Sequence, residues 1–135
     1  IQAAVLSVKL RYLAEWNALR VRAAERYRSN LACCKDIVLP ALAPHSTHIY
    51  HLFVVQVPGN RDTILEIMSQ HGIQCGIHYP IPLHLQKAYA YLGYHEGDFP
   101  NAEAIAKKII SLPMFPEITE EQIDYISATL LKAIQ

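Results

Sequence analysis

The N-terminal part of the chain repeats apolar side chains at intervals of three and four residues. The stripe consists of Leu6, Leu10, Leu13, Trp16 and Leu19. This spacing places the five side chains on one face of an α-helix, because an α-helix has about 3.6 residues per turn. Most charged residues of the segment fall off the stripe. The pattern therefore predicts one long amphipathic helix from Gln2 to about Ser29.

Three short apolar runs further along the chain have the composition of β-strands. The run Tyr50–Val57 is rich in β-branched and aromatic residues and is closed by a Pro-Gly pair. Both of its faces are mostly apolar, which predicts a strand covered on both sides. The second predicted strand is Ile73–Ile77 and the third is Ile109–Met114. A short extended stretch is also expected at 37–39, inside a connector that contains two prolines.

Helix signals lie between and after these runs. Asn60 is placed to cap a helix, and Gly72 stands where a left-handed C-terminal cap is expected. A short helix is predicted over 85–92, and a helix beginning at Pro100 is predicted to reach about Lys108. The sequence Thr119-Glu-Glu-Gln122 is a capping-box signature for a terminal helix. Helices alternating with three short strands predict a small α/β sandwich, in which helices pack against one sheet.

Length and composition indicate one globular domain. The chain has 135 residues, of which 52 % are hydrophobic and 18 % are charged. The three cysteines, Cys33, Cys34 and Cys75, are odd in number and lack C-x-x-C spacing, so neither a disulfide framework nor a zinc site is predicted. Reduced thiols are typical of a cytoplasmic protein. Because no apolar run approaches the roughly 20 residues that span a bilayer, no membrane partner is expected.

The charge balance argues against a nucleic-acid partner, although the charge is unevenly distributed. Twelve basic and twelve acidic residues cancel overall. The N-terminal segment is nevertheless rich in basic residues, namely Lys9, Arg11, Arg20, Arg22, Arg26, Arg28 and Lys35. One reading is a helix that binds nucleic acid, and the other is the solvated face of an amphipathic helix. The second reading is favoured, so no nucleic-acid binding is predicted.

The histidines do not form a convincing metal-binding motif. His45, His48 and His51 are three positions apart, which would align them on a helix. The segment has the pattern of loop and strand, where residues three apart point to opposite faces. No metal site is therefore predicted. His51 is instead expected to be a buried polar residue that anchors a turn before the strand.

The strongest candidate for a binding segment is the stretch from His78 to His84, which we call the arm. Its prolines, Pro80 and Pro82, fix φ at about −65° and push the residues before them into extended conformations. A stiff arm at the exit of a strand suits the presentation of binding residues. The imidazoles of His78 and His84 can donate hydrogen bonds to ligand oxygens, as recognition of hydroxyl or phosphate groups requires, and Tyr79 adds a polar aromatic ring. We therefore take His78, Tyr79 and His84 as candidate binding residues, with a purely structural role for the histidines as the alternative.

No catalytic or cofactor-binding residue is predicted in the chain. It contains no Gly-x-Gly-x-x-Gly motif, no P-loop and no nucleophile elbow. None of the lysines lies in an apolar context that would lower its pKa for Schiff-base chemistry. Taken alone, the sequence lacks a complete active site.

Several motifs of the chain occur together in an order that is found elsewhere. They are Gln2-Ala-Ala, Lys9-Leu10 to Trp16-Asn17, Tyr50-His51-Leu52-Phe53, Arg61-Asp62, Gly76-Ile-His-Tyr-Pro-Ile-Pro-Leu-His84, Gly97-Asp-Phe-Pro-Asn-Ala-Glu103 and Ser111-Leu-Pro-Met-Phe-Pro116. With these motifs the chain resembles a known family, the pyridoxal-phosphate-dependent sugar aminotransferases of the DegT/DnrJ/StrS group. The motifs cover essentially the whole chain in order, and they resemble the C-terminal region of the family. The His-Tyr-Pro-x-Pro-x-His stretch is the most specific of them.

The resemblance implies a fold and a function. The expected fold is the small C-terminal domain of a fold-type-I aminotransferase, with a mainly antiparallel, three-stranded sheet packed by helices and formed by residues 1–135. Family members transfer an amino group, usually from glutamate, to a nucleotide-linked keto sugar, and they act as homodimers. The resemblance implies that His78 and Tyr79 line the sugar-nucleotide side of the active site. The alternative is a catalytically inert, stand-alone sugar-nucleotide-binding or dimerisation module.

The resemblance also implies that a large part of the enzyme lies outside this sequence. The family's N-terminal domain carries the Schiff-base lysine, the aspartate that faces the pyridine nitrogen and the phosphate cradle. None of these residues maps onto a position here, so the chain alone is not expected to bind pyridoxal phosphate or to transaminate. An exposed apolar patch is expected along the first helix and the arm, where the missing domain would dock. Such patches drive self-association, so a dimer or higher oligomer is expected.

Overall fold

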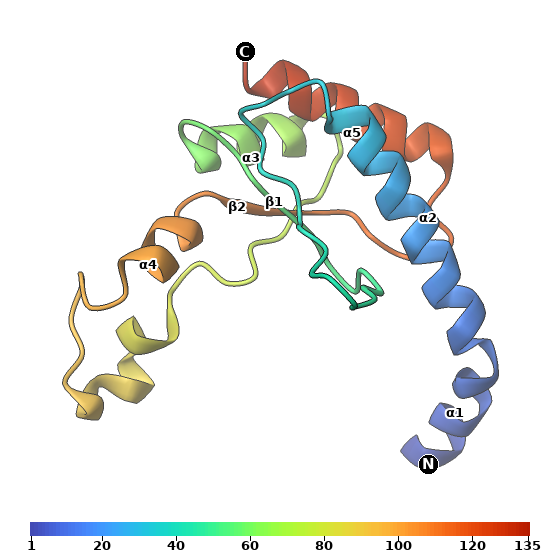
Figure 1. Cartoon of the computed structure of the whole chain (residues 1–135), viewed down its shortest axis with the longest axis horizontal. Helices are drawn as coiled ribbons and strands as arrows, with labels where there is room; N and C mark the ends of the chain where they lie inside the picture. The colour runs from blue at the N-terminus through green and yellow to red at the C-terminus, as the bar shows by residue number, and fades with distance from the viewer.

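The computed structural model describes residues 1–135 and begins with a long helical segment. This segment consists of α1 (Gln2–Lys9), a 3₁₀ turn (Leu10–Tyr12) and α2 (Leu13–Leu31). The predicted N-terminal helix is thus confirmed, with a short 3₁₀ interruption. In Figure 1, α1 extends away from the rest of the molecule, whereas the C-terminal half of α2 lies beside α5 (Glu120–Ala133).

The sheet has two antiparallel strands, β1 (Phe53–Gln56) and β2 (Ile109–Leu112). Phe53 pairs with Leu112 at one end and Gln56 pairs with Ile109 at the other. The predicted extended stretch at 37–39 reaches the outer edge of β1, where Val38 forms a single antiparallel bridge with Gln56. Both runs predicted for these strands are confirmed, although each strand is shorter than its run.

The prediction of a third strand at Ile73–Ile77 is wrong. Only Gly76 from this run reaches the sheet, where it forms one antiparallel bridge with Ser111. At one end of the run, Ile73 donates its N–H to Met68 in the preceding helix. At the other end, the chain soon enters the arm, whose prolines have no N–H to add to a ladder. Too few residues remain between these two constraints to form a regular strand.

Helix α3 (Arg61–Gln70) begins and ends as its sequence predicts. The Asn60 side chain accepts hydrogen bonds from the N–H groups of Asp62 and Thr63. Gly72 has a φ of +74°, a left-handed conformation that glycine adopts without steric cost. The N–H of Gly72 donates to the Ser69 carbonyl and the N–H of Ile73 donates to the Met68 carbonyl. These two bonds form a Schellman motif, which satisfies the last carbonyls of the helix.

The terminal helix α5 also begins at its predicted cap. Thr119 Oγ1 accepts from the N–H of Gln122, and Gln122 Oε1 accepts from the N–H of Thr119. This reciprocal pair is the predicted capping box, and it is confirmed.

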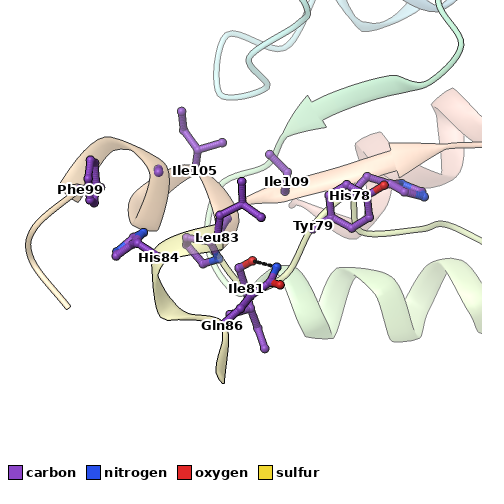
Figure 2. A pocket seen from close by; sticks show the side chains of 12 residues that line it. His78, Tyr79, Ile81, Leu83, His84, Gln86, Phe99, Ile105 and Ile109 are labelled. Atoms are coloured by element: carbon purple, nitrogen blue, oxygen red, sulfur yellow. Dashed lines mark hydrogen bonds between the residues drawn. The ribbon is translucent and has the colours of Figure 1, made fainter. Parts of the chain in front are cut away.

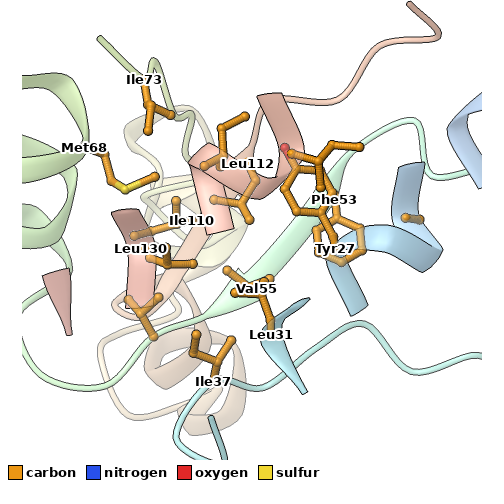
Figure 3. Close-up of a cluster of buried hydrophobic side chains, with 14 of the residues drawn as sticks. Tyr27, Leu31, Ile37, Phe53, Val55, Met68, Ile73, Ile110, Leu112 and Leu130 are labelled. Carbon is orange, nitrogen blue, oxygen red and sulfur yellow. The ribbon is translucent and has the colours of Figure 1, made fainter. Parts of the chain in front are cut away.

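The hydrophobic core lies between the sheet and helices α2, α3 and α5. Figure 3 shows Tyr27 and Leu31 from α2 meeting Phe53 and Val55 from β1. The rings of Tyr27 and Phe53 stack with centroids 4.9 Å apart. The Tyr27 hydroxyl donates to the Pro113 carbonyl at 2.8 Å, so its polar end is satisfied although the ring is fully buried.

None of the five residues of the predicted apolar stripe belongs to this core, which takes other residues of the helix. The residues of α2 that are buried are Ala23, Ala24, Tyr27 and Leu31. By contrast, Leu6 and Leu10 are 64 % and 67 % exposed, and Leu13 is also exposed. The expected apolar patch on the first helix is therefore present. We call it the helix patch and define it as Val5, Leu6, Val8, Leu10, Tyr12 and Leu13.

The segment between the arm and β2 forms a lobe beside the core, at the lower left of Figure 1. The predicted short helix at 85–92 is found as two 3₁₀ helices, Leu83–Leu85 and Lys87–Leu92. Helix α4 (Pro100–Ala106) follows, with Pro100 in its first turn as predicted. None of the helices in the structure is both long and apolar enough to cross a bilayer.

Candidate functional site

The N-terminal end of the arm is fixed on β2. Gly76 and Ser111 exchange both backbone hydrogen bonds, at 3.0 and 2.8 Å. Nδ1 of His78 lies 2.8 Å from Oγ of Ser111, and the peptide bond between His78 and Tyr79 is cis. A Cβ atom at position 76 would lie only 2.8 Å from Cε1 of His78. Glycine at this position therefore leaves the space in which the His78 ring reaches Ser111.

The C-terminal end of the arm is fixed on α4. Nε2 of His84 lies 2.9 Å from Oε1 of Glu103, and their side chains are only 8 % and 9 % exposed. The same carboxylate accepts hydrogen bonds from the N–H groups of Gly97 and Phe99. The His84 ring also packs against the Phe99 ring, with centroids 4.7 Å apart.

The protonation of this pair follows from the contacts of Glu103. Burial acts to raise the pKa of the Glu103 carboxyl, but hydrogen bonds from Gly97, His84 and Phe99 together lower it below its usual value. Glu103 is thus a carboxylate at neutral pH. Because a carboxylate only accepts hydrogen bonds, Nε2 of His84 carries the proton that they share.

A pocket of about 480 Å³ opens between the arm and α4. Figure 2 shows its apolar wall, to which the arm contributes Ile81 and Leu83 and the facing side contributes Phe99, Ile105 and Ile109. Its polar side chains are His78, Tyr79, His84 and Gln86. Such a pocket suits a ligand with an apolar or flat portion and a few hydrogen-bonding groups.

The structure brings the three predicted binding residues to one pocket but gives them different surroundings. Tyr79 is 71 % exposed. His78 is exposed but uses Nδ1 for Ser111, which leaves Nε2 for a ligand. His84 has committed its Nε2–H to Glu103 within the chain. Tyr79 is therefore the freest of the three to meet a ligand, and His84 is the least free.

The residues that line the pocket between the arm and α4 do not fit a pyridoxal phosphate site. The six lysines are Lys9, Lys35, Lys87, Lys107, Lys108 and Lys132, and all are exposed. None of them lines the pocket between the arm and α4. The cofactor requires a lysine amine within its site, and no side chain of this pocket supplies one.

The prediction for His51 is contradicted by the structure. His51 is exposed, so the prediction that it is a buried turn anchor is wrong. The local contact before the strand is made instead by His48, which is also exposed and whose Nδ1 accepts from the N–H of Tyr50 at 2.8 Å. Tyr50 is buried with a φ of +48°, and this local bond supports its unusual conformation. The structure contains no group of three His, Cys, Asp or Glu side chains arranged to hold a metal ion.

Sequence reasoning did not assign a role to Ser111 or Glu103. Both are buried polar residues. Ser111 holds the arm at His78, and Glu103 holds it at His84. A polar side chain within the apolar strand β2 and an acidic residue in the first turn of α4 were the available signals. Neither signal names a partner, because Ser111 and Glu103 lie 33 and 19 positions from the histidines that they contact.

The chain belongs to the DegT/DnrJ/EryC1/StrS aminotransferase family, whose model matches residues 1–131. It is 44 % identical over 130 residues to the erythromycin biosynthesis sensory transduction protein EryC1 of Saccharopolyspora erythraea, covering 96 % of this chain and 35 % of that protein. It is 39 % identical over 122 residues to the dTDP-3-amino-3,4,6-trideoxy-alpha-D-glucose transaminase of Streptomyces venezuelae, covering 90 % of this chain and 32 % of that enzyme.

Solved structures agree with this assignment. The crystal structure of S. venezuelae DesV in complex with a ketimine intermediate superposes with a TM-score of 0.91 at 38 % identity, covering 99 % of this chain and 36 % of that one. The PMP form of Spr1654 from Streptococcus pneumoniae gives a TM-score of 0.81 at 29 % identity, covering 93 % of this chain and 32 % of that one. The chain spans about a third of the length of the relatives that it matches.

Proposed function

We propose that residues 1–135 are the C-terminal small domain of a pyridoxal-phosphate-dependent aminotransferase. The parent enzyme transfers an amino group from an amino acid, glutamate in our proposal, to a nucleotide-linked keto sugar. The observation that carries this proposal is the arm, which is held at both ends and presents Tyr79 beside an apolar pocket. Relatives named as dTDP-sugar transaminases support the substrate class.

The three arm residues have distinct roles in this proposal. The Tyr79 hydroxyl donates to an oxygen of the sugar nucleotide, and its ring covers a flat face of the ligand. His78 offers Nε2, because Ser111 holds its other ring nitrogen. His84 belongs to the same substrate-binding surface through its ring, which forms part of the pocket wall. All three residues act by binding and orienting the substrate, and none carries out a chemical step.

The catalytic groups belong to the N-terminal domain of the parent enzyme in this proposal. The 135-residue chain is then expected neither to hold pyridoxal phosphate nor to transaminate, since the pocket between the arm and α4 contains no lysine. Mixing the chain with pyridoxal phosphate, followed by borohydride reduction and mass spectrometry, tests this expectation. A stoichiometric adduct on one lysine would contradict it.

A titration tests the sugar-nucleotide site directly. A dTDP-linked amino sugar is added to the chain, and NMR shifts of arm amides report binding. Weak saturable binding is expected, with at least a severalfold loss of affinity in His78→Ala and in Tyr79→Phe. Tyr91→Phe is the matched control, because Tyr91 is 80 % exposed and does not line the pocket. Equal affinity in all four proteins would reject the assigned contacts.

The proposal extends to assembly and location. The parent enzyme is a homodimer, and the helix patch together with the exposed arm residues provides apolar surface for protein contacts. A cytoplasmic location suits an enzyme of nucleotide-sugar metabolism and agrees with three free cysteines.

A further inference from the structure

The buried carboxylate of Glu103 is not a ligand contact in the function proposed above. Glu103 lies on α4, is 7 % exposed and does not line the pocket. Three donors converge on it, namely Nε2 of His84 and the N–H groups of Gly97 and Phe99. We call this arrangement the Glu103 clamp.

The clamp connects two segments that contact the same pocket. The N–H groups of Gly97 and Phe99 belong to the loop that leads into α4, and Phe99 is part of the pocket wall. His84 ends the arm and is the middle residue of the 3₁₀ turn Leu83–Leu85. One carboxylate therefore sets the distance between the two sides of the pocket.

The middle of the arm has little else to hold it. Tyr79, Ile81 and Leu83 are exposed, and the two prolines between them have no N–H to donate. Gln86 donates to the Ile81 carbonyl at 3.4 Å, a long bond at an exposed position (Figure 2). The place of Tyr79 is consequently determined by the two fixed ends, at Ser111 and at Glu103.

We propose that Glu103 is a positioning residue, which fixes the arm against α4 through His84 and thereby sets the place of Tyr79 in the pocket. That Tyr79 meets a sugar nucleotide rests on the function proposed above, but the mechanical role of Glu103 does not. A carboxylate suits this role because its two oxygens accept from all three donors at once. The amide of glutamine has a single acceptor oxygen and adds donors of its own.

NMR relaxation of the ¹⁵N-labelled 135-residue chain tests the clamp without any ligand. In the unmodified chain, the amides of Tyr79, Ile81 and Leu83 are expected to have order parameters of about 0.85, as in rigid backbone. In Glu103→Gln these values are expected to fall below about 0.6, while the amides of β1 and β2 keep theirs. The His84 Nε2–H signal, slowly exchanging in the unmodified chain, is expected to disappear.

Two further variants separate the clamp from general loss of structure. His84→Asn removes the tether to the arm but leaves Glu103 its two backbone donors, so it loosens the arm and keeps α4 folded. Glu96→Gln is the matched control, because Glu96 is an exposed acid of the same loop that pairs only with exposed Lys107 at 3.3 Å. If Glu103→Gln does not fold, His84→Asn decides the question. Arm order parameters that stay near 0.85 in the folded variants overturn the proposal, whether or not a sugar nucleotide binds.

Discussion

Arg26 on α2 and Asp124 on α5 form a two-pronged ion pair that links the two longest helices of the core. Nε of Arg26 donates to Oδ1 of Asp124 at 2.8 Å, and Nη2 donates to Oδ2 at 2.7 Å. Asn30, one turn further along α2, donates to the same carboxylate at 2.7 Å. Parallel bonds of this kind fix both the distance and the rotation between two helices. The two partners are 98 positions apart in the sequence, so no local pattern indicates that they pair.

The first prediction concerns acid stability. Hydrogen bonds from Arg26 and then from Asn30 lower the pKa of Asp124 to about 2, from an ordinary value of 3.8. Because the folded pKa lies below the unfolded one, the carboxylate stabilises the fold above about pH 4, and this contribution disappears as the pH falls to about 2. Asp124→Asn is therefore expected to lower the unfolding midpoint at pH 7, with a difference that shrinks between pH 4 and pH 2. Urea unfolding of both proteins at several pH values measures this difference in midpoint.

A second variant provides the control for this pair. Arg26→Leu removes the cation that lowers the pKa of Asp124, so it should abolish most of the same pH-dependent difference. If the unfolding midpoints of Asp124→Asn and the unmodified chain differ equally at pH 7 and at pH 2, the ion pair is not the source of the effect.

The second prediction concerns the core. Leu130 on α5 is fully buried among side chains of the sheet and helices. Leu130→Ala leaves a cavity and is expected to reduce the free energy of unfolding by about 2 to 5 kcal/mol. Leu42→Ala is the matched control, because Leu42 is exposed in a loop, and its effect is expected to stay within about 0.5 kcal/mol. Denaturant unfolding followed by circular dichroism compares the two, and equal losses would contradict the assigned core.

Local signals predicted the ends of the helices well, whereas contacts between distant segments were not predictable. Asn60, Gly72 and Thr119 each act on backbone groups within a few residues, so their sequence neighbours contain the whole interaction. The run Ile73–Ile77 failed as a strand because a helix cap at one end and the arm at the other leave it too short. Strand composition cannot reveal that competition.

In the candidate site, too, local features could be predicted from the sequence, whereas contacts between distant residues could not. The prolines predicted a non-helical arm, which the structure shows from His78 to Pro82, and its histidines were recognised as polar groups that could bind or support. Which role each histidine has depends on Ser111 and Glu103, which are remote in sequence. The stripe on the first helix was likewise readable as a helix face. Only the fold reveals that its N-terminal half has no partner within the chain.

The third prediction concerns Gly76. A methyl group at this position would lie 2.8 Å from Cε1 of the His78 ring, closer than packed atoms tolerate. The clash is with the end of a side chain, so the ring is expected to turn away while the backbone stays in place. Gly76→Ala should therefore change the free energy of unfolding by no more than about 1.5 kcal/mol, the net value of one hydrogen bond. It should nevertheless break the contact between His78 and Ser111.

A double-mutant cycle isolates this contact. In a His78→Ala background there is no ring to displace, so Gly76→Ala should have almost no further effect on sugar-nucleotide affinity. In the unmodified background it should weaken affinity about as much as His78→Ala does. NMR of the histidine ring nitrogens reports whether His78 has left Ser111, and additive effects of the two substitutions would argue against the mechanism.

The last prediction concerns self-association through the helix patch. Leu6 and Leu10 are largely exposed, one helical turn apart, on a helix that extends from the core (Figure 1), and exposed apolar side chains of this kind favour contact with a second copy. Size-exclusion chromatography with light scattering is expected to show a dimer or higher oligomer at high concentration. Leu10→Glu puts a charge in the patch and should shift the population towards monomer, since burying an unpaired carboxylate is costly. Leu42→Glu, at an exposed loop position outside the patch, should leave the distribution unchanged. Two results would show that the patch does not mediate contacts between copies. One is a chain that stays monomeric at every concentration, and the other is an oligomer whose population Leu10→Glu leaves unchanged.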